Sequence, residues 1–493
     1  MNVMGKINVE KIEKRAFING KYVDATGGKT FEKVLSFDGK TVLSGIACCD
    51  ENDVDIAVDI ADKVYKSGIW SGKTPEERKA IILKMADLME ASREELALLD
   101  TYETGRAYKN YYEDSIPKAV EAVRYFAESI DKLYDSAIPP RGNEFAVVSR
   151  VPLGVVGLIT PWNDPMVVTC WKLAPALLMG NSVVLKPAEQ SSLSAIKLAS
   201  IALEAGVPAG VFNVVPGYGE VTGQALAMHK KVRGISFTGS SEIGKKMLIY
   251  SGESNMKRVT LECGGKGPFI VTDKCKDIHE AARVLADSMF YNQGQICSAP
   301  SRVIIAKDKK EEFTQILVKE SERYLPGNSF ESDNNVGCVV SKEQYDRVKG
   351  YIELAKNEGL EVLQPEGDKE HPQEAFCFKP TIITNVSPNS RLANEEIFGP
   401  VVVIIPVDST DEAISIANNS EYGLAGAVWT DDLNEAYKVC KSVEVGLMHI
   451  NSYGNDDNAA PFGGVKQSGI GKDKSVYAFD DFCDKKTVWM HFK

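Results

Sequence analysis

Short apolar segments recur between positions 153 and 261, and amphipathic stretches separate them. They predict strands at residues 154–159, 183–185, 211–215, 234–237 and 259–261. One intervening stretch, residues 191–204, places Leu193, Ile196, Ala199 and Leu203 on one face of a helix. Such alternation is typical of βαβ units on a parallel sheet, whose ligands bind at the carboxyl ends of the strands.

A second alternating region extends from residue 268 to residue 450. The pattern predicts strands at residues 302–305, 401–406 and 425–429, and helices at 309–324 and 343–357. Nearer the start, residues 54–99 and 119–134 have helical periodicity. The chain is therefore expected to be an α/β protein with two parallel-sheet domains.

Composition narrows the classes of protein. The chain of 493 residues is too long for a single domain of ordinary size. Its composition, 44% hydrophobic and 26% charged residues, is typical of a globular protein. The net charge is -12 and no Lys/Arg-rich run is present, so nucleic acid is not an expected partner. Residues 1–20 contain Glu10 and Glu13 and lack the apolar core of a signal peptide, and no apolar run approaches the roughly 20 residues of a membrane span. We expect a cytoplasmic location and no membrane partner.

The ten cysteines are scattered without paired metal-ligand spacing, so no metal site is expected. Cys297 differs from the others because it lies in a polar, glycine-containing stretch, residues 292–299, after a helical pattern. Such surroundings favour a nucleophile over a buried structural thiol. No His is near it and the chain has only five, which weakens a Cys-His hydrolase without excluding it.

Polar residues follow several of the predicted strands. Glu262 ends one strand, and Asn163 follows another and could present its amide to an oxyanion. Lys186 and Glu189 follow a third, where a ribose could lie, and the Glu189 carboxylate would repel a 2′-phosphate and favour NAD over NADP. A solvated loop glutamate, a turn at Pro161–Asn163 and surface charge are the structural alternatives.

Two glycine-containing segments resemble phosphate-binding loops. Gly217-Tyr218-Gly219 with Gly223 does not meet the dinucleotide fingerprint spacing, and a turn with positive φ explains it equally. Residues 237–240 end a strand and open a helix, so their amides and Ser240 could receive a phosphate. A Ser240 N-cap is the alternative.

Taken together, these motifs resemble the aldehyde dehydrogenase superfamily over nearly the whole chain. The resemblance is carried by residues 17–20, 160–163, 186–189, 237–240, 261–266, 294–297, 395–400 and 461–464. It implies an NAD-binding domain (residues 1–130 and 152–263), a catalytic domain (264–470) and an oligomerisation arm with the tail (131–151 and 471–493). It also implies an aldehyde substrate and a homo-oligomer, a dimer or a tetramer.

The resemblance further implies roles for individual residues. Cys297 would be the nucleophile, Glu262 the general base, and Asn163 with the Cys297 amide the oxyanion hole, with Lys186 also in the catalytic set. The cofactor would lie against Ile159, Thr160, Trp162, Lys186, Ala188, Glu189, Gly219, Gly223, Phe237, Gly239, Ser240, Ile243, Glu262, Cys263, Gly264, Gln344, Glu396 and Phe398.

A finer similarity is to bacterial dehydrogenases of γ-glutamyl-γ-aminobutyraldehyde and related aminoaldehydes. The expected substrate-facing residues are Asp164, Val168, Trp171, Tyr291, Ile296, Ser298, Asp456, Asp457 and Phe462. The acids, with Trp171 and Tyr291 as cation-π faces, would favour an amine or guanidine group. Asp164 also precedes Pro165 and a helical pattern, so an N-cap is the alternative, as are solvated charges for Asp456 and Asp457.

Three other functions compete with the aminoaldehyde hypothesis. A broad-specificity aliphatic or aromatic aldehyde dehydrogenase would share the same machinery. An NAD-independent cysteine esterase would use Cys297 alone. A structural protein on the same fold is the third, against which the joint presence of Cys297, Glu262 and Asn163 argues.

Overall fold

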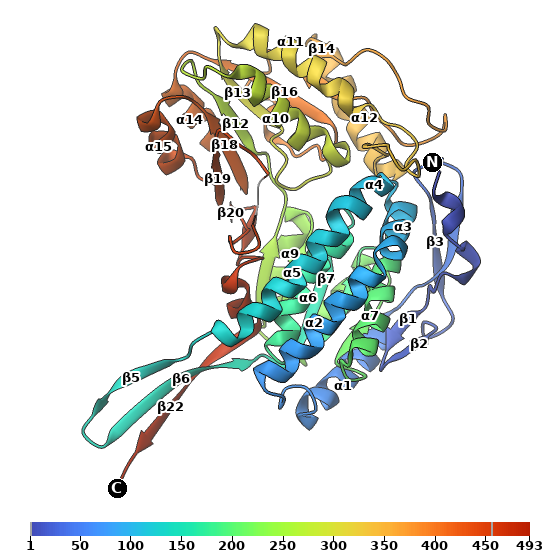
Figure 1. Ribbon diagram of the computed structural model, residues 1–493, viewed down its shortest axis with the longest axis vertical. Coiled ribbons are helices and arrows are strands. Elements are labelled where there is room, and N and C mark those ends of the chain that lie inside the picture. Colours follow the sequence, from blue (N-terminus) through green and yellow to red (C-terminus); the bar gives the residue numbers. More distant parts are fainter. Residues whose placement is uncertain (1, 455–456) are drawn as a thin grey trace.

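The structure is a computed structural model that describes residues 2–454 and 457–493. It contains two α/β domains and a projecting arm (Figure 1). The first domain is built on an eight-stranded sheet of order β2-β1-β9-β8-β7-β10-β11-β21. Its parallel strands are β7 (Val155–Thr160), β8 (Ser182–Pro187), β9 (Phe212–Val214), β10 (Val232–Thr238) and β11 (Arg258–Glu262). All five strands predicted from the apolar pattern are confirmed, with ends that shift by a few residues.

Antiparallel strands and helices complete this domain. The sheet is extended at its edges by β1 (Ala16–Ile18), β2 (Lys21–Val23) and β21 (Gly469–Ile470). The helices are α1 (Glu51–Ser67), α2 (Pro75–Ala91), α3 (Arg93–Thr104), α4 (Tyr108–Asn110), α5 (Ile116–Ser129), α6 (Pro165–Leu178), α7 (Leu193–Ala205), α8 (Gln224–Met228) and α9 (Ser241–Ser254). The predicted helix at 119–134 is shorter, because the chain becomes extended at Leu133 after a 3-10 turn.

The strand order creates a crevice at the carboxyl end of β7. From β7 the chain proceeds to β8 and β9 on one side and returns to β10 and β11 on the other. The register aligns Ile159 with Lys186 and with Phe237, and Thr238 with Glu262. The loops after these strands therefore begin side by side, which is where a doubly wound sheet binds its ligand.

The second domain contains a seven-stranded sheet of order β14-β15-β16-β13-β12-β18-β19. Its strands are β12 (Pro268–Val271), β13 (Arg302–Ala306), β14 (Val362–Leu363), β15 (Thr381–Ile383), β16 (Val401–Val407), β18 (Ala425–Trp429) and β19 (Leu447–Ile450). Its helices are α10 (Ile278–Phe290), α11 (Lys310–Ser321), α12 (Lys342–Asn357), α13 (Arg391–Asn394), α14 (Thr410–Asn418) and α15 (Leu433–Ser442). Small two-stranded sheets pair β3 (Thr30–Val34) with β4 (Val42–Ala47) and β17 (Tyr422–Gly423) with β20 (Val465–Lys466).

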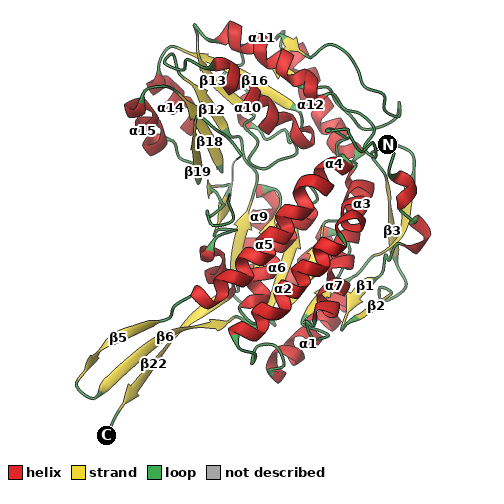
Figure 2. Cartoon of the chain, in the orientation of Figure 1, coloured by secondary structure: helices red, strands yellow, loops and turns green. Residues whose placement is uncertain are grey.

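The arm is a three-stranded antiparallel sheet that projects from the first domain and carries the C-terminus at its tip (Figure 2). It consists of β5 (Ser136–Arg141), β6 (Glu144–Pro152) and β22 (Cys483–His491), with β6 in the centre. The tail contributes an edge strand to the arm, which begins at Cys483. Before it, Phe479 and Phe482 are buried in the core of the first domain.

Candidate active site

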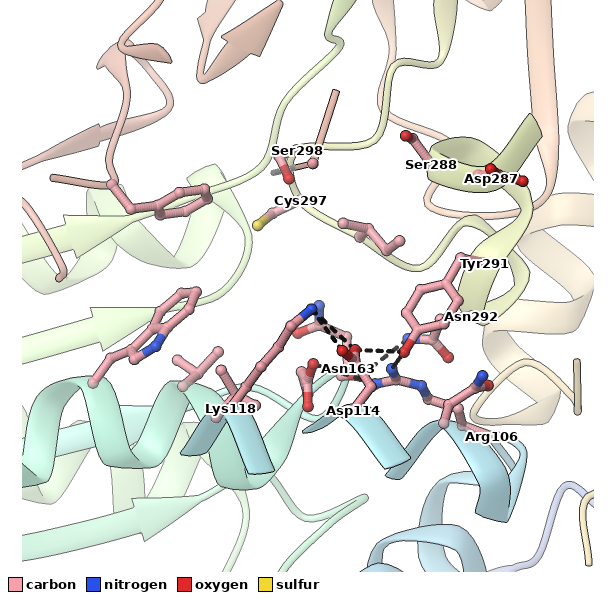
Figure 3. Close-up of a pocket in the computed structure, with 18 of the residues that line it drawn as sticks. Arg106, Asp114, Lys118, Asn163, Asp287, Ser288, Tyr291, Asn292, Cys297 and Ser298 are labelled. Atoms are coloured by element: carbon pink, nitrogen blue, oxygen red, sulfur yellow. Dashed lines mark hydrogen bonds and ion pairs between the residues drawn. The ribbon is translucent and has the colours of Figure 1, made fainter. Parts of the chain in front are cut away.

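A cavity of about 690 Å³ opens between the two domains, and Cys297 lies in its wall (Figure 3). Asn163 also lines it. Eight of the residues expected to face a substrate line the same cavity: Asp164, Val168, Trp171, Tyr291, Ile296, Ser298, Asp457 and Phe462. Asp456, the ninth, lies outside the described residues.

The backbone before Cys297 is tightly constrained. Asn292, Gln293 and Gly294 are consecutive left-handed residues, with φ of 51°, 54° and 67°. The Gln293 side-chain amide donates to and accepts from the backbone of Phe378, at 3.0 and 2.9 Å. A Cβ on Gly294 would stand 2.2 Å from the carbonyl oxygen of Gly399. This turn fixes where the chain delivers Cys297.

Cys297 lines the cavity, and its side chain is otherwise surrounded by protein atoms. Burial raises its pKa above the ordinary range of a cysteine, and the negative charges of Glu262 and Glu396 raise it further. The thiol is therefore protonated in the resting protein. The same electrostatic coupling shows that both carboxylates are near the sulfur.

Asn163 follows β7 and is held by its own hydrogen bonds. Its side-chain nitrogen donates to the Gln295 carbonyl at 3.1 Å, and its carbonyl accepts from the Asn292 side chain at 3.0 Å. A primary amide has two N–H donors. One is engaged with Gln295, and the other is available to an oxyanion beside Cys297.

Glu262 ends β11 and is 6% exposed. Within the described chain, neither of its carboxylate oxygens has a hydrogen-bond partner of ordinary geometry. Burial raises its pKa well above the usual value, and the charge of Asp473 raises it further. A Cβ on Gly463 would meet Glu262 Oε1 at 2.3 Å, so the glycine makes room for the carboxyl group.

A buried ion pair beside Glu262 was not predicted from the sequence. Lys172 Nζ lies 2.8 Å from Asp473 Oδ2, and the two side chains are 1% and 7% exposed. The pair brings α6 together with the loop before the C-terminal strand. Lys172 is the one charged residue in the apolar helix α6. A single charge in such a helix was the feature of the sequence that could have pointed to a buried ion pair.

The expected cofactor residues lie around the crevice of the first sheet. They follow or end adjacent strands: Ile159, Thr160 and Trp162 at β7; Lys186, Ala188 and Glu189 at β8; Gly219 and Gly223 after β9; Phe237, Gly239, Ser240 and Ile243 at β10; Glu262, Cys263 and Gly264 at β11. The structure thus brings these residues to the carboxyl ends of neighbouring strands in the first sheet. Their roles stay a prediction.

The Lys186–Glu189 pair and Ser240 have clear local contacts. Lys186 Nζ lies 2.9 Å from Glu189 Oε2, and Glu189 is partly exposed. The Ser240 hydroxyl caps α9 by accepting from the Ile243 amide at 3.3 Å, as the N-cap alternative anticipated. A Cβ added at Gly219, which is exposed, or at Gly223, which is buried, would meet nothing within 4 Å, so a ligand could approach their backbone closely.

Glu396, Phe398 and Gln344 come from the second domain. Glu396 Oε1 accepts from the Gly265 amide at 2.8 Å, and the Phe398 ring packs edge-on against Trp162 at 5.3 Å. Gln344 donates its side-chain amide to the Phe398 carbonyl at 2.8 Å. Gln344 therefore supports the backbone of this loop, and its role toward the cofactor stays a prediction.

The Asp164 side chain has partners within the protein. It occupies the N-cap of α6, but its side chain makes no cap hydrogen bond. Asp164 Oδ2 instead lies 3.3 Å from the Arg106 guanidinium and accepts from Ser115 at 3.2 Å. Its other oxygen, Oδ1, is buried without a hydrogen-bond partner among the described residues, and its role toward an amine stays a prediction.

Protein cations also lie over both aromatic rings that were expected to receive a substrate cation. Arg106 lies 4.7 Å from the Tyr291 ring centre, and Lys474 lies 5.3 Å from that of Trp171. The role of these rings as cation-π faces for a substrate stays a prediction. Arg106 and Lys474 come from segments distant in sequence, which is why the linear pattern did not reveal them.

Further charged residues line the cavity, and they come from the short helical turn after α4 and from α5. Lys118 pairs with Asp114 at 2.9 Å, and the Tyr291 hydroxyl donates to Asp114 at 2.9 Å (Figure 3). Glu113 and Glu121 are nearby on the same stretch of chain. In the sequence this segment has the alternation of a solvated helix and gives no sign that it borders a cavity.

Among the described residues, no cluster of His, Cys, Asp and Glu could hold a metal ion, and no helix is long and apolar enough to cross a membrane. A sequence model of the aldehyde dehydrogenase family matches residues 22–488. The chain belongs to the aldehyde dehydrogenase family.

Relatives of known name cover nearly all of this family member. The NADP/NAD-dependent aldehyde dehydrogenase PuuC of Escherichia coli (strain K12) is 43% identical, over 97% of this chain and 96% of that protein. The solved structure of the P. syringae indole-3-acetaldehyde dehydrogenase AldA in complex with NAD+ and IAA has a TM-score of 0.95 at 43% identity, covering 98% of this chain and 97% of that one. The γ-glutamyl-γ-aminobutyraldehyde dehydrogenase of Burkholderia cenocepacia J2315 has a TM-score of 0.95 at 41% identity, covering 99% and 98%.

Proposed function

We propose that this protein oxidises an aldehyde to its carboxylic acid with NAD, through a thioester on Cys297. The observation that carries the proposal is the convergence of Cys297 and Asn163 on one cavity, with Glu262 close enough to shift the pKa of the thiol. A nucleophile, an oxyanion donor and a base are the three groups that acyl transfer through a cysteine requires.

The first half of the reaction forms the thioester. The Cys297 thiol proton passes by way of Glu262 to solvent, and the thiolate attacks the aldehyde carbon, which makes a tetrahedral alkoxide. The second amide N–H of Asn163 and the Cys297 backbone N–H stabilise that oxygen, and one such donor is typically worth about a hundred- to a thousandfold in rate. Bound NAD would supply the hydride acceptor that allows the alkoxide to collapse to the thioester.

The second half releases the acid. Glu262 removes a proton from water, which attacks the thioester and restores the thiol. The raised pKa of Glu262 makes its carboxylate a stronger base, and the charges of the buried Lys172–Asp473 pair also act on that pKa. A base for water also argues against coenzyme A as the acyl acceptor, because a thiol acceptor needs no activated water.

The residues around the first-sheet crevice fit NAD. Lys186 and Glu189 form a polar pair beside the strand ends, and the open backbone at Gly219 and Gly223 leaves room for a phosphate. The Glu189 carboxylate would repel a 2′-phosphate, so NAD is preferred over NADP. That PuuC is named NADP/NAD-dependent supports a dinucleotide without settling the preference.

We further propose an aldehyde whose tail carries an amine. The described cavity lining contains six carboxylates, Glu113, Asp114, Glu121, Asp164, Asp287 and Asp457, against four cations, Arg106, Lys109, Lys118 and Lys474. The excess of negative charge attracts a cation to the mouth. The B. cenocepacia relative is named for such a substrate, whereas AldA is named for a neutral aromatic one, which supports broad specificity as the second candidate.

Comparing 4-aminobutanal with butanal tests this substrate class. The wild-type protein is expected to show the higher kcat/KM for 4-aminobutanal, with NAD above NADP. Lys118→Ala removes the cation that neutralises Asp114, so the preference for the amine should increase severalfold at low salt. Lys231→Ala, which breaks a surface pair with Asp59, is the control. Equal efficiency for both aldehydes in every protein would contradict the proposal.

The arm supports a homo-oligomer as part of the same proposal. Val488, Trp489 and Phe492 are 44%, 58% and 56% exposed near the end of β22. Large apolar side chains gathered on a projecting sheet are typical of a protein–protein contact. A second copy of the chain is the proposed partner.

A further inference from the structure

Arg106 is a buried arginine that the catalytic sequence above does not use. It follows the left-handed Gly105 at the end of α3 and is 2% exposed. Its backbone amide donates to the Thr104 hydroxyl at 3.3 Å. A charged group buried so deeply needs partners, and their identity is informative.

The guanidinium group contacts two segments that lead to the reacting atoms. Its Nη1 lies 3.3 Å from Asp164 Oδ2, and its Nη2 donates to the Tyr291 hydroxyl at 2.5 Å. The central guanidinium carbon also lies 4.7 Å from the ring centre of Tyr111 and 4.7 Å from that of Tyr291. Arg106 is therefore fixed in position and in orientation (Figure 3).

Each partner is next to a catalytic group. Asp164 directly follows Asn163, the proposed oxyanion donor. Tyr291 begins the constrained turn that delivers Cys297. The two segments meet again where the Asn292 side chain donates to the Asn163 carbonyl at 3.0 Å. A shift of either segment would change the distance between the amide donor and the sulfur.

We propose that Arg106 is a positioning residue, which sets the placement of Asn163 relative to Cys297 by holding Asp164 and Tyr291 together. The inference rests on the proposed function. It requires a planar fork with two separate donors, which arginine supplies and lysine does not. Misplacement of reacting groups by about 1 Å typically costs on the order of a hundredfold in rate, so the effect falls on kcat.

The test compares Arg106→Lys and Arg106→Ala with the wild type. We expect kcat for aldehyde oxidation to fall at least about tenfold in both, with the KM for NAD and the melting temperature little changed. Guanidinium ion at non-denaturing concentration should restore part of the activity of Arg106→Ala, but none in Asn163→Ala. Arg124→Met, which breaks an exposed pair with Asp87, is the matched control.

Three outcomes decide the matter. Wild-type kcat in Arg106→Lys overturns the inference. So does a loss of activity that follows the melting temperature and is not rescued by guanidinium, because that pattern is purely structural. If the wild-type protein itself fails to oxidise aldehydes with NAD, the proposed function fails instead.

Discussion

At the scale of the residue, the Glu262 carboxyl group shows how reactivity and stability oppose each other. It is buried without a described hydrogen-bond partner of ordinary geometry, which disfavours its charged form. Once deprotonated, a carboxylate of raised pKa is a stronger base toward water than an ordinary glutamate. Its presence costs the folded protein stability whenever the unfolded chain can ionise the same group.

This cost has a definite pH dependence. Because the folded pKa lies above the ordinary 4.5, the stability linked to Glu262 is fully present below that value and is lost as pH rises through the folded pKa. Glu262→Gln removes the titration. We expect its melting temperature relative to the wild type to be higher at pH 8 than at pH 5, measured by scanning fluorimetry. A difference independent of pH would contradict this account.

Single residues also show what the sequence could and could not predict. Cys297, Glu262 and Asn163 follow strands or interrupt patterns, so their chemistry stands out along the chain. Arg106 and Lys474 do not, because their significance comes from rings and carboxylates contributed by distant segments. The partners of Asp164, Arg106 and Ser115, were not predicted for the same reason.

At the scale of the element, the turn before Cys297 is the most constrained part of the site. Gly294 combines a φ of 67° with a backbone contact that leaves no room for a side chain. The strands were predictable because apolar periodicity reports burial directly. The turn was not, since three successive left-handed residues leave little trace in hydrophobicity.

Gly294→Ala tests this turn. Strain and the clash with Gly399 should lower stability by about 1–3 kcal/mol and reduce kcat, because Cys297 is displaced from Asn163. Melting temperature and steady-state kinetics measure the two effects. Gly252→Ala in α9, where a Cβ meets nothing within 4 Å, should leave kcat unchanged and should not lower the melting temperature. A fully active Gly294→Ala protein would show that the turn does not position the thiol.

At the scale of the whole molecule, the arm is a three-stranded sheet that projects away from both domains. Its strands extend from the first domain (Figure 1). Val488, Trp489 and Phe492, near the end of β22, are exposed apolar side chains. Two parallel-sheet domains were foreseeable from the alternation of elements. The relative position of the arm was not, because it depends on pairing β22 with β6 across most of the sequence.

Trp489→Lys tests whether this sheet mediates assembly. A lysine in place of an exposed apolar ring should weaken a contact between copies and shift the protein toward smaller species. Light scattering after size exclusion measures the molar mass. Ile69→Lys, at a site 55% exposed away from the arm, is the control and should leave the mass unchanged. The same mass for both variants would place the interface elsewhere.

The most direct test of the thioester is a rapid-mixing experiment on Glu262→Gln with aldehyde and NAD. Without the base, the first half of the reaction should proceed once and stop. We predict a burst of about one NADH per subunit and an acyl adduct on the peptide that contains Cys297. Continued turnover without an adduct, or an undiminished rate in Cys297→Ala, would contradict the account.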